Sequence, residues 1–253
     1  HFEYPWFMLA LTLITFISFV DDIRSTSQVL RLVFHFSAMA LMFYQWGLFS
    51  LPWWTLFVAL IVCTGIINAY NFMDGINGIT GGYSLVILAA LAYINTEITQ
   101  FVEPALIYTV LCSVLVFCFF NFRKKAKCFA GDVGSVSMGF IVLFMLLSLI
   151  VKTGDVTYLV FLAVYGVDTV MTLIYRFIRG ENIFRSHRRH VYQRLVDESG
   201  LSHLTVAGLF SCLQLAISLG ALYLPVNKWV YLTVVVLALS IGYIYLIYRM
   251  RGV

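Results

Sequence analysis

Long runs of hydrophobic residues alternate with short polar segments along most of the chain. Because about 20 apolar residues are needed to cross the hydrocarbon core of a bilayer, each run predicts a membrane-spanning helix. The predicted spans are residues 4–20, 29–46, 51–69, 79–95, 102–122, 133–151, 156–175, 204–222 and 228–248. We therefore expect an all-α, polytopic integral membrane protein with about nine transmembrane helices.

The composition agrees with a chain that lies in a lipid bilayer. Hydrophobic residues make up 62% of the 253 residues, charged residues only 11%, and the mean hydropathy is +0.94. A soluble domain would carry about a quarter charged residues. The cysteines show no paired spacing, so we expect free thiols: Cys63, Cys112, Cys118, Cys128 and Cys212. We expect no nucleic-acid partner.

The basic residues are concentrated in alternate loops between the predicted spans. One set of loops holds 14 of the 16 lysines and arginines: Arg24, Arg31, Arg123, Lys124, Lys125, Lys127, Arg176, Arg179, Arg185, Arg188, Arg189, Arg194, Arg249 and Arg251. The other set holds only Lys152 and Lys228. The positive-inside rule places the first set in the cytoplasm. It predicts an N-terminus outside and a C-terminus inside.

Polar residues gather in four clusters, all on the predicted cytoplasmic side. They are Asp21 and Asp22 after the first span, Asn68, Asn71, Asp74 and Asn77 at the end of the third, Asp132 in the segment CFAGDVGSVSMGF, and His187 and His190 in the loop SHRRHVYQRL. A fifth polar position, Asp168, lies within the seventh span. Acidic residues at membrane depth are costly and usually functional. We expect the clusters to form one shared site.

Each cluster taken alone also has a structural interpretation. An aspartate pair after a span is compatible with a solvated helix end, and asparagines in a span can bond neighbouring helices. Asp132 could cap the following helix. The histidines and arginines could belong to an ordinary basic loop, and Asp168 could pair with Arg176. The sequence leaves these alternatives open.

Taken together, the clusters predict metal-assisted chemistry on a phosphorylated substrate. Carboxylate and carboxamide oxygens are hard ligands that suit Mg²⁺, with Mn²⁺ as an alternative. Glycines among them let backbone approach a phosphate closely. Histidine and arginine in the basic loop can neutralise a diphosphate. A lipid phosphate would reach such a site from the bilayer, and a nucleotide-activated donor from the cytosol.

The order of these motifs resembles a known family. DD, then NxxNxxDGxNG, then GDxGS and a histidine-containing loop are similar to the polyprenyl-phosphate N-acetylhexosamine-1-phosphate transferases, a glycosyltransferase family 4 type. The resemblance implies that UDP-N-acetylhexosamine and undecaprenyl phosphate give undecaprenyl-diphospho-sugar and UMP. HRRHVYQ, with DTVMTLIYR upstream, looks like the branch that initiates O-antigen synthesis. It implies a bacterial inner-membrane enzyme with a cytoplasmic active site.

The resemblance also implies roles for individual residues. Asn71 and Asp132 would hold Mg²⁺, and Asp21 and Asp22 would lie near the lipid phosphate, so that the three aspartates form the catalytic set. A larger set would bind the substrates: Asn68, Asp74, Asn77, Phe129, Asp168, His187 and His190.

Within that larger set the implied roles differ. Asp74 and Asn77 would line the nucleotide site, and Phe129 would stack on uracil. His187 and His190 would contact the diphosphate or the sugar. Asn77 stands where many relatives carry Asp, so it offers a hydrogen-bonding group without the charge.

Several wider expectations follow from the resemblance. Residues 1–253 should form a single transmembrane transferase domain in contact with the lipid bilayer. Because the chain opens at His1 almost directly into a span, we expect a fragment that lacks about two N-terminal spans of the family. A homodimer stays open. The alternatives are a phospho-MurNAc-pentapeptide transferase, a cation-coupled secondary transporter, and a truncated, non-catalytic membrane scaffold.

Overall fold

The protein consists of helices joined by short loops in this computed structural model, which describes residues 3–24, 26–182 and 187–250. Within that part of the chain the elements are α1 Pro5–Ile23, α2 Gln28–Gln45, η1 Leu48–Ser50, α3 Trp53–Met73, α4 Ile79–Tyr93, η2 Ile94–Ile98, α5 Pro104–Asn121, α6 Gly131–Thr153, η3 Val156–Leu162, α7 Ala163–Ile178, α8 Val191–Asp197, α9 His203–Tyr223 and α10 Lys228–Met250. Arg185 and Arg251 of the predicted topology lie outside the described residues.

All nine predicted spans coincide with helices. Among the described helices, eight are long and apolar enough to cross a membrane. The ninth is α2, which has a glutamine at each end and carries Arg31 and His35, so its hydropathy falls short. An all-α, multi-pass membrane protein is therefore confirmed. The orientation of the termini stays a prediction.

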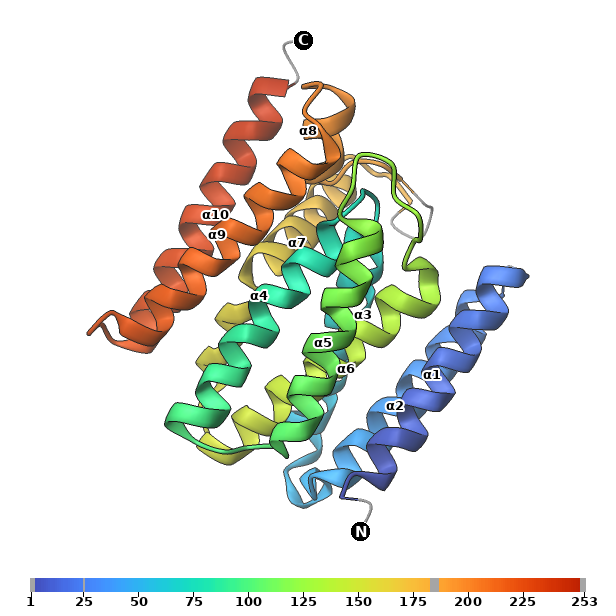
Figure 1. Cartoon of the computed structure of the whole chain (residues 1–253), viewed down its shortest axis with the longest axis vertical. Coiled ribbons are helices and arrows are strands. Elements are labelled where there is room, and N and C mark those ends of the chain that lie inside the picture. The colour runs from blue at the N-terminus through green and yellow to red at the C-terminus, as the bar shows by residue number, and fades with distance from the viewer. Residues whose placement is uncertain (1–2, 25, 183–186, 251–253) are drawn as a thin grey trace. The chain divides into compact units, whose positions relative to one another are not determined.

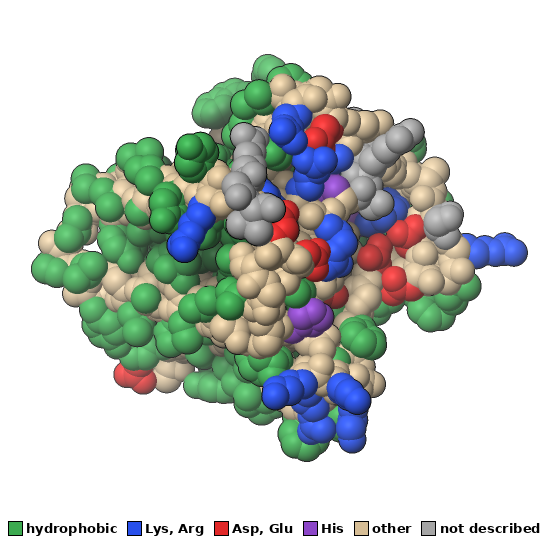
Figure 2. Space-filling view, turned by 90° about the horizontal axis from the view of Figure 1, so that it is seen from above, with side chains coloured by type: hydrophobic (Ala, Val, Ile, Leu, Met, Phe, Trp, Pro, Cys, Tyr) green, Lys and Arg blue, Asp and Glu red, His purple; other side chains and the backbone are tan. Residues whose placement is uncertain are grey.

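The surface is rich in large hydrophobic side chains (Figure 2). Trp53, Phe177 and Tyr248 are each at least 75% exposed. Such exposure on helices of spanning length is expected where lipid, rather than water, surrounds the protein. The five cysteines are free thiols, as predicted.

The chain divides into two compact units, which are described separately. The first comprises residues 1–74 and 129–154, and the second comprises residues 75–128 and 155–253. In the first unit, α1 packs against α2 and α6, and α3 packs against α6 (Figure 1). A glycine allows the close approach of α3 and α6, because a Cβ at Gly139 would lie 2.8 Å from the Cβ of buried Tyr70.

Gly139→Ala is expected to destabilise the first unit by about 1–3 kcal/mol, the usual cost of overpacking a tight core. The added methyl group would force α6 away from Tyr70, which precedes Asn71 on α3. The change would lower the thermal unfolding midpoint in detergent. Gly65→Ala is the control, since a Cβ there meets nothing within 4 Å and a helical Gly→Ala change gains about 0.5–1 kcal/mol. Equal midpoints for the two variants would contradict the close packing.

In the second unit, α4 packs against α5 and α9, and α7 packs against α10. A buried glutamine on α9 connects three of these elements. Gln214 Oε1 accepts hydrogen bonds from the Tyr83 hydroxyl at 2.9 Å and from Val164 N at 3.2 Å, and its Nε2 donates to Val160 O at 3.1 Å. The predicted seventh span begins as the 3₁₀ helix η3, and these bonds fix η3 and the start of α7.

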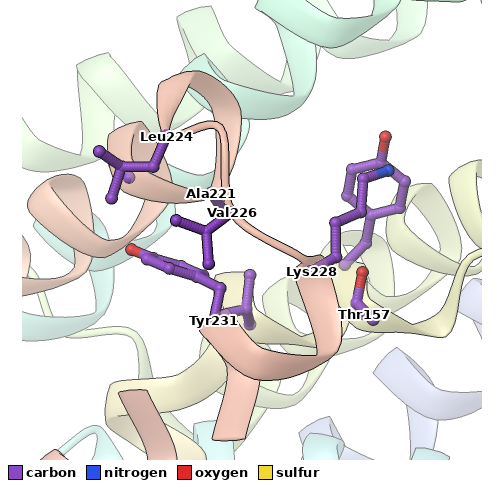
Figure 3. Close-up of a pocket in the computed structure, with 9 residues that line it drawn as sticks. Thr157, Ala221, Leu224, Val226, Lys228 and Tyr231 are labelled. Atoms are coloured by element: carbon purple, nitrogen blue, oxygen red, sulfur yellow. The ribbon is translucent and has the colours of Figure 1, made fainter. Parts of the chain in front are cut away.

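An ion pair lies beside a small cavity of the second unit, and Figure 3 shows the residues that line this cavity, among them Lys228. Lys228 Nζ lies 2.6 Å from Asp155 Oδ2 and 5.1 Å from the ring centre of Tyr158. The cavity beside them measures about 20 Å³, enough for about one water molecule. A cavity of this size offers no room for a substrate.

Candidate functional site

The first unit brings together two residues that are 61 positions apart. Asp132 lies in the first turn of α6, and Asn71 lies in the last turn of α3. Asn71 Nδ2 donates to Asp132 Oδ1 at 2.8 Å and to Ser135 Oγ at 3.2 Å. The Asp132 side chain is 28% exposed, so a carboxylate and a carboxamide meet at a position that a ligand can reach.

Arg31 joins the aspartate of α1 to this pair. Its Nη1 lies 2.8 Å from Asp21 Oδ2, and its Nη2 lies 3.3 Å from Asp132 Oδ2. The other oxygen of Asp21 accepts from both the backbone N and the hydroxyl of Thr26, each at 2.6 Å. One guanidinium therefore bridges carboxylates from α1 and α6.

Asp22 binds the start of α6. Its two carboxylate oxygens accept the backbone N–H groups of Asp132 and Val133 at 3.1 and 3.2 Å. The first N–H groups of a helix have no partner within the helix, and they attract negative charge. Gly131 has φ +62°, and a Cβ there would lie 2.9 Å from Asp22 Oδ2. Asp22, rather than Asp132, thus satisfies the helix start, and Asp22 is more than a solvated helix end.

The oxygen groups of this cluster fit a magnesium ion whose remaining ligands come from the substrate. In the described part of the chain, no group of three or more His, Cys, Asp or Glu side chains could hold a metal by itself. Mg²⁺ commonly binds through one or two carboxylates plus substrate phosphates. Asp132 and, with its amide turned, Asn71 offer that partial set of hard oxygen ligands.

The second unit holds a buried carboxylate on α7 that fixes the start of α8. Asp168, 5% exposed, accepts from Val191 N at 3.1 Å and from Tyr192 N at 3.4 Å. Its Oδ1 also lies 3.1 Å from His190 Nδ1 and accepts from the Thr172 hydroxyl at 3.2 Å. A carboxylate beside Nδ1 favours the proton on that nitrogen and orients the imidazole.

One structural interpretation of the sequence paired Asp168 with Arg176, but the two side chains do not form an ion pair. Arg176 is buried and lies instead against Glu181, with Nε 3.3 Å from Oε2. Glu181 also pairs with Arg189, Nη1 to Oε1, at 3.0 Å. Glu181 therefore connects Arg176 of α7 to Arg189 of the basic loop.

His187 lies beside His190, with ring centres 5.0 Å apart. Its Nδ1 is buried and has no hydrogen-bond partner among the described residues. Burial, together with the electrostatic effects of His190, Arg176 and Arg189, lowers the pKa of His187 to about 4, although Glu181 opposes the shift. The ring is therefore neutral at pH 7.

Acidification is expected to destabilise this loop through His187. Its folded pKa of about 4 lies below the unfolded value of about 6.5, so the opened loop binds the proton more readily. The contribution of the neutral His187 ring to the free energy of unfolding is fully present above about pH 6.5 and is lost as the pH falls toward about 4. The unfolding midpoint of the native chain should fall more between pH 7.5 and 5 than that of His187→Gln. Parallel pH curves for the two would contradict the shift.

An arginine-lined cavity of about 340 Å³ lies in the second unit. Its walls are formed by Tyr175, Arg179, Arg188, Arg189, Arg194 and Glu198. Arg188 and Arg194 each donate through Nε and Nη2 to one carboxylate, that of Asp197 or of Glu198. An arginine has five N–H donors, so each retains donors for an anion. The lining favours a phosphate-bearing ligand.

The four remaining residues predicted for the site have other surroundings. Asn68 donates to Thr64 O of its own helix at 2.8 Å, and Asp74 caps α3. Asn77 lies beyond α3, where its side chain donates to Arg123 O at 3.1 Å. The every-third-residue register therefore does not continue along one helix. Phe129 is 75% exposed. Their substrate-binding roles stay predictions.

Arg31, Ser135 and Thr172 belong to these clusters, but the sequence did not point to them as site residues. Ser135 stands three positions after Asp132 in GDVGS, the spacing that places two side chains near one another on a helix, so this residue could have been found. Arg31 drew attention only as a basic residue that determines topology. Thr172 carried no signal in the sequence.

The fold and the first cluster define a multi-pass membrane protein with a carboxylate and amide site at the ends of its helices. The family model described as glycosyl transferase family 4 matches residues 4–150. The chain belongs to that family, as its motifs predicted.

Individual relatives extend the comparison beyond the family model. A probable undecaprenyl-phosphate N-acetylglucosaminyl 1-phosphate transferase of Bacillus subtilis (strain 168) is 27% identical over 208 residues, which is 81% of this chain and 57% of the relative. An undecaprenyl-phosphate alpha-N-acetylglucosaminyl 1-phosphate transferase of Escherichia coli (strain K12) is 28% identical over 251 residues, 89% and 68% of the two chains.

A peptidoglycan relative matches a shorter stretch. The phospho-N-acetylmuramoyl-pentapeptide-transferase of Lactiplantibacillus plantarum is 35% identical over 101 residues, 40% of this chain and 31% of the relative. The chain thus spans between about a third and about two thirds of the length of these three relatives.

Proposed function

We propose that this chain transfers N-acetylhexosamine-1-phosphate from a UDP-sugar to undecaprenyl phosphate and releases UMP. The observation that carries the proposal is the meeting of Asn71 and Asp132 at 2.8 Å, with Arg31 bridging Asp132 to Asp21. The names of the B. subtilis and E. coli relatives make N-acetylglucosamine the first sugar to test. The reaction would begin O-antigen or another cell-surface polysaccharide.

In this reaction, neutralising the negative charge of the phosphates matters more than removing a proton. A phosphate monoester has its second pKa near about 6, so the lipid phosphate carries nearly two negative charges at pH 7. One of its oxygens attacks the phosphorus that bears the sugar. A new P–O–P bond forms, and the bond to UMP breaks with its electron pair on UMP. Positioning and electrostatic stabilisation dominate such transfers.

The first unit supplies the polar groups for the reacting phosphates. Asp132 and Asn71 would hold a Mg²⁺ ion, which when bound neutralises charge on the diphosphate. Asp22 holds the first turn of α6, and Asp132 with it, through two backbone hydrogen bonds. Asp21 fixes Arg31, so we assign Asp21 an organising role rather than that of a general base.

The second unit supplies cations and oriented imidazoles. We assign the arginine-lined cavity and His187 to an anionic group of a substrate, because the lining is cationic and the neutral ring can donate a hydrogen bond. Asp168 would act through His190, whose ring it orients.

The test is UMP release from membranes that contain the chain, with undecaprenyl phosphate, Mg²⁺ and a panel of UDP-sugars. The proposal expects UMP only when lipid phosphate and one N-acetylated donor are both present, and loss of UMP with EDTA. UMP from UDP-MurNAc-pentapeptide alone would favour the peptidoglycan branch. No UMP from any donor, also after the chain is extended at its N-terminus to the length of its relatives, would contradict the transferase.

Two other functions compete less well. Membership of glycosyl transferase family 4 argues against a secondary transporter, and transporters bind their ions near the bilayer midplane, whereas Asp22 and Asp132 meet where α1 ends and α6 begins. A non-catalytic scaffold would bind UDP-sugar without forming UMP. We place the reaction at the cytoplasmic face of the bacterial inner membrane, because the basic loops carry the histidines.

A further inference from the structure

Each oxygen of the two carboxylates that Arg31 bridges lies against at least one protein donor. Asp132 Oδ1 accepts from Asn71 and Asp132 Oδ2 faces Arg31. Asp21 Oδ1 accepts from Thr26 and Asp21 Oδ2 faces Arg31. A cation that approaches Asp132 through Oδ2 therefore meets Arg31 at the same oxygen.

Arg31 is the donor most easily displaced. Its side chain is 26% exposed and begins in the first turn of α2, so it can swing away without any change of backbone. A divalent ion competes directly for the oxygens that Arg31 contacts. A released guanidinium pairs best with a carboxylate or a phosphate, through two parallel hydrogen bonds.

We propose that Arg31 is an exchangeable counter-ion. It holds Asp21 and Asp132 together in the cation-free state, yields Asp132 to a divalent ion, and then binds a phosphate oxygen of the substrate. The inference rests on the proposed function, which supplies both the ion and the phosphate. It follows that ion and phosphate bind cooperatively, because the phosphate gives Arg31 a new partner.

The experiment measures Mn²⁺ binding to the full chain in detergent by electron paramagnetic resonance, without turnover. Arg31→Gln should bind Mn²⁺ alone about two- to fivefold more tightly than the native chain, the range expected for partly exposed ion pairs. UDP-N-acetylglucosamine should tighten Mn²⁺ binding to the native chain by about fivefold or more. The same ligand should tighten binding to Arg31→Gln by less than about twofold.

Two further variants keep the test decisive. Arg24→Gln removes the same charge from an exposed position in the same unit, and it should behave as the native chain does. Arg31→Lys keeps the charge but cannot bridge two carboxylates with a fork, so its coupling should be intermediate even if Arg31→Gln fails to fold. Unchanged affinity and coupling in the Arg31 variants would overturn the exchange while leaving the metal site intact. No Mn²⁺ binding by the native chain would overturn both.

Discussion

Asp132→Ala is expected to lower the rate of UMP release by a factor on the order of 10²–10³, the size of effect seen when one electrostatic contact to a transition state is lost. The change removes the carboxylate that contacts both Asn71 and Arg31. Asn71→Ala should be similarly damaging. Asp21→Asn and Asp22→Asn should each lower the rate less, because the reaction is limited by neutralising the charge of the phosphates rather than by base catalysis.

The measurement is UMP release by the four variants in the same membranes, with unfolding midpoints recorded in parallel. Glu97→Ala is the control, because Glu97 is exposed and belongs to the other unit. Asp22→Asn needs the stability check most, since Asp22 holds the first turn of α6. If Asp21→Asn or Asp22→Asn proved more damaging than Asp132→Ala at equal stability, the mechanism in which Asp132 and Asn71 hold a metal ion against the diphosphate would be wrong.

Asp168→Ala is expected to cost about 3–5 kcal/mol of stability, because several buried donors lose their acceptor and each unsatisfied buried group costs about 1–3 kcal/mol. The change leaves buried donors on Val191, Tyr192 and Thr172 without their acceptor. It also releases His190 from its fixed orientation. Both the unfolding midpoint and UMP release should fall, and hydrogen exchange at the start of α8 should rise.

Asp168→Asn separates the two effects. An amide keeps the size and one acceptor oxygen, so much of the stability should return, while the charge that orients His190 is lost. UMP release should therefore remain low. Thr172→Val is the control, since it keeps the shape and the Asp168 charge while it removes the hydrogen bonds of the Thr172 hydroxyl to Asp168 and Tyr243. Full activity in Asp168→Asn would exclude a role for the charge.

The helices could be predicted from the sequence because a spanning helix needs only an apolar run of sufficient length. Helix ends were harder to predict when their partners are distant. Ser202 caps α9 from the adjacent position, whereas the start of α6 is held by Asp22, which lies more than a hundred residues earlier in the chain. No local pattern reports such a partner. The first predicted span consequently ended before Asp21 and Asp22, although α1 includes both.

The site was only partly predictable for a similar reason. Asn71 and Asp132 could be matched because their motifs resemble those of the family, in which the resemblance implies a shared metal ion. Asn68 shares the spacing of Asn71, yet its amide bonds the Thr64 carbonyl of its own helix. Arg31 was counted only as a charge in a loop, since its contacts depend on how three helices pack.

The contact between Gly131 and Asp22 makes two distant motifs thermodynamically dependent on each other. A side chain at position 131 would be strained by the positive φ and would collide with the carboxylate at position 22. Once Asp22 is shortened or removed, part of that penalty disappears. Substitutions at the two positions should therefore be non-additive in a double-mutant cycle. The aspartate pair and the GDxGS segment would thus accept change together more readily than either would alone.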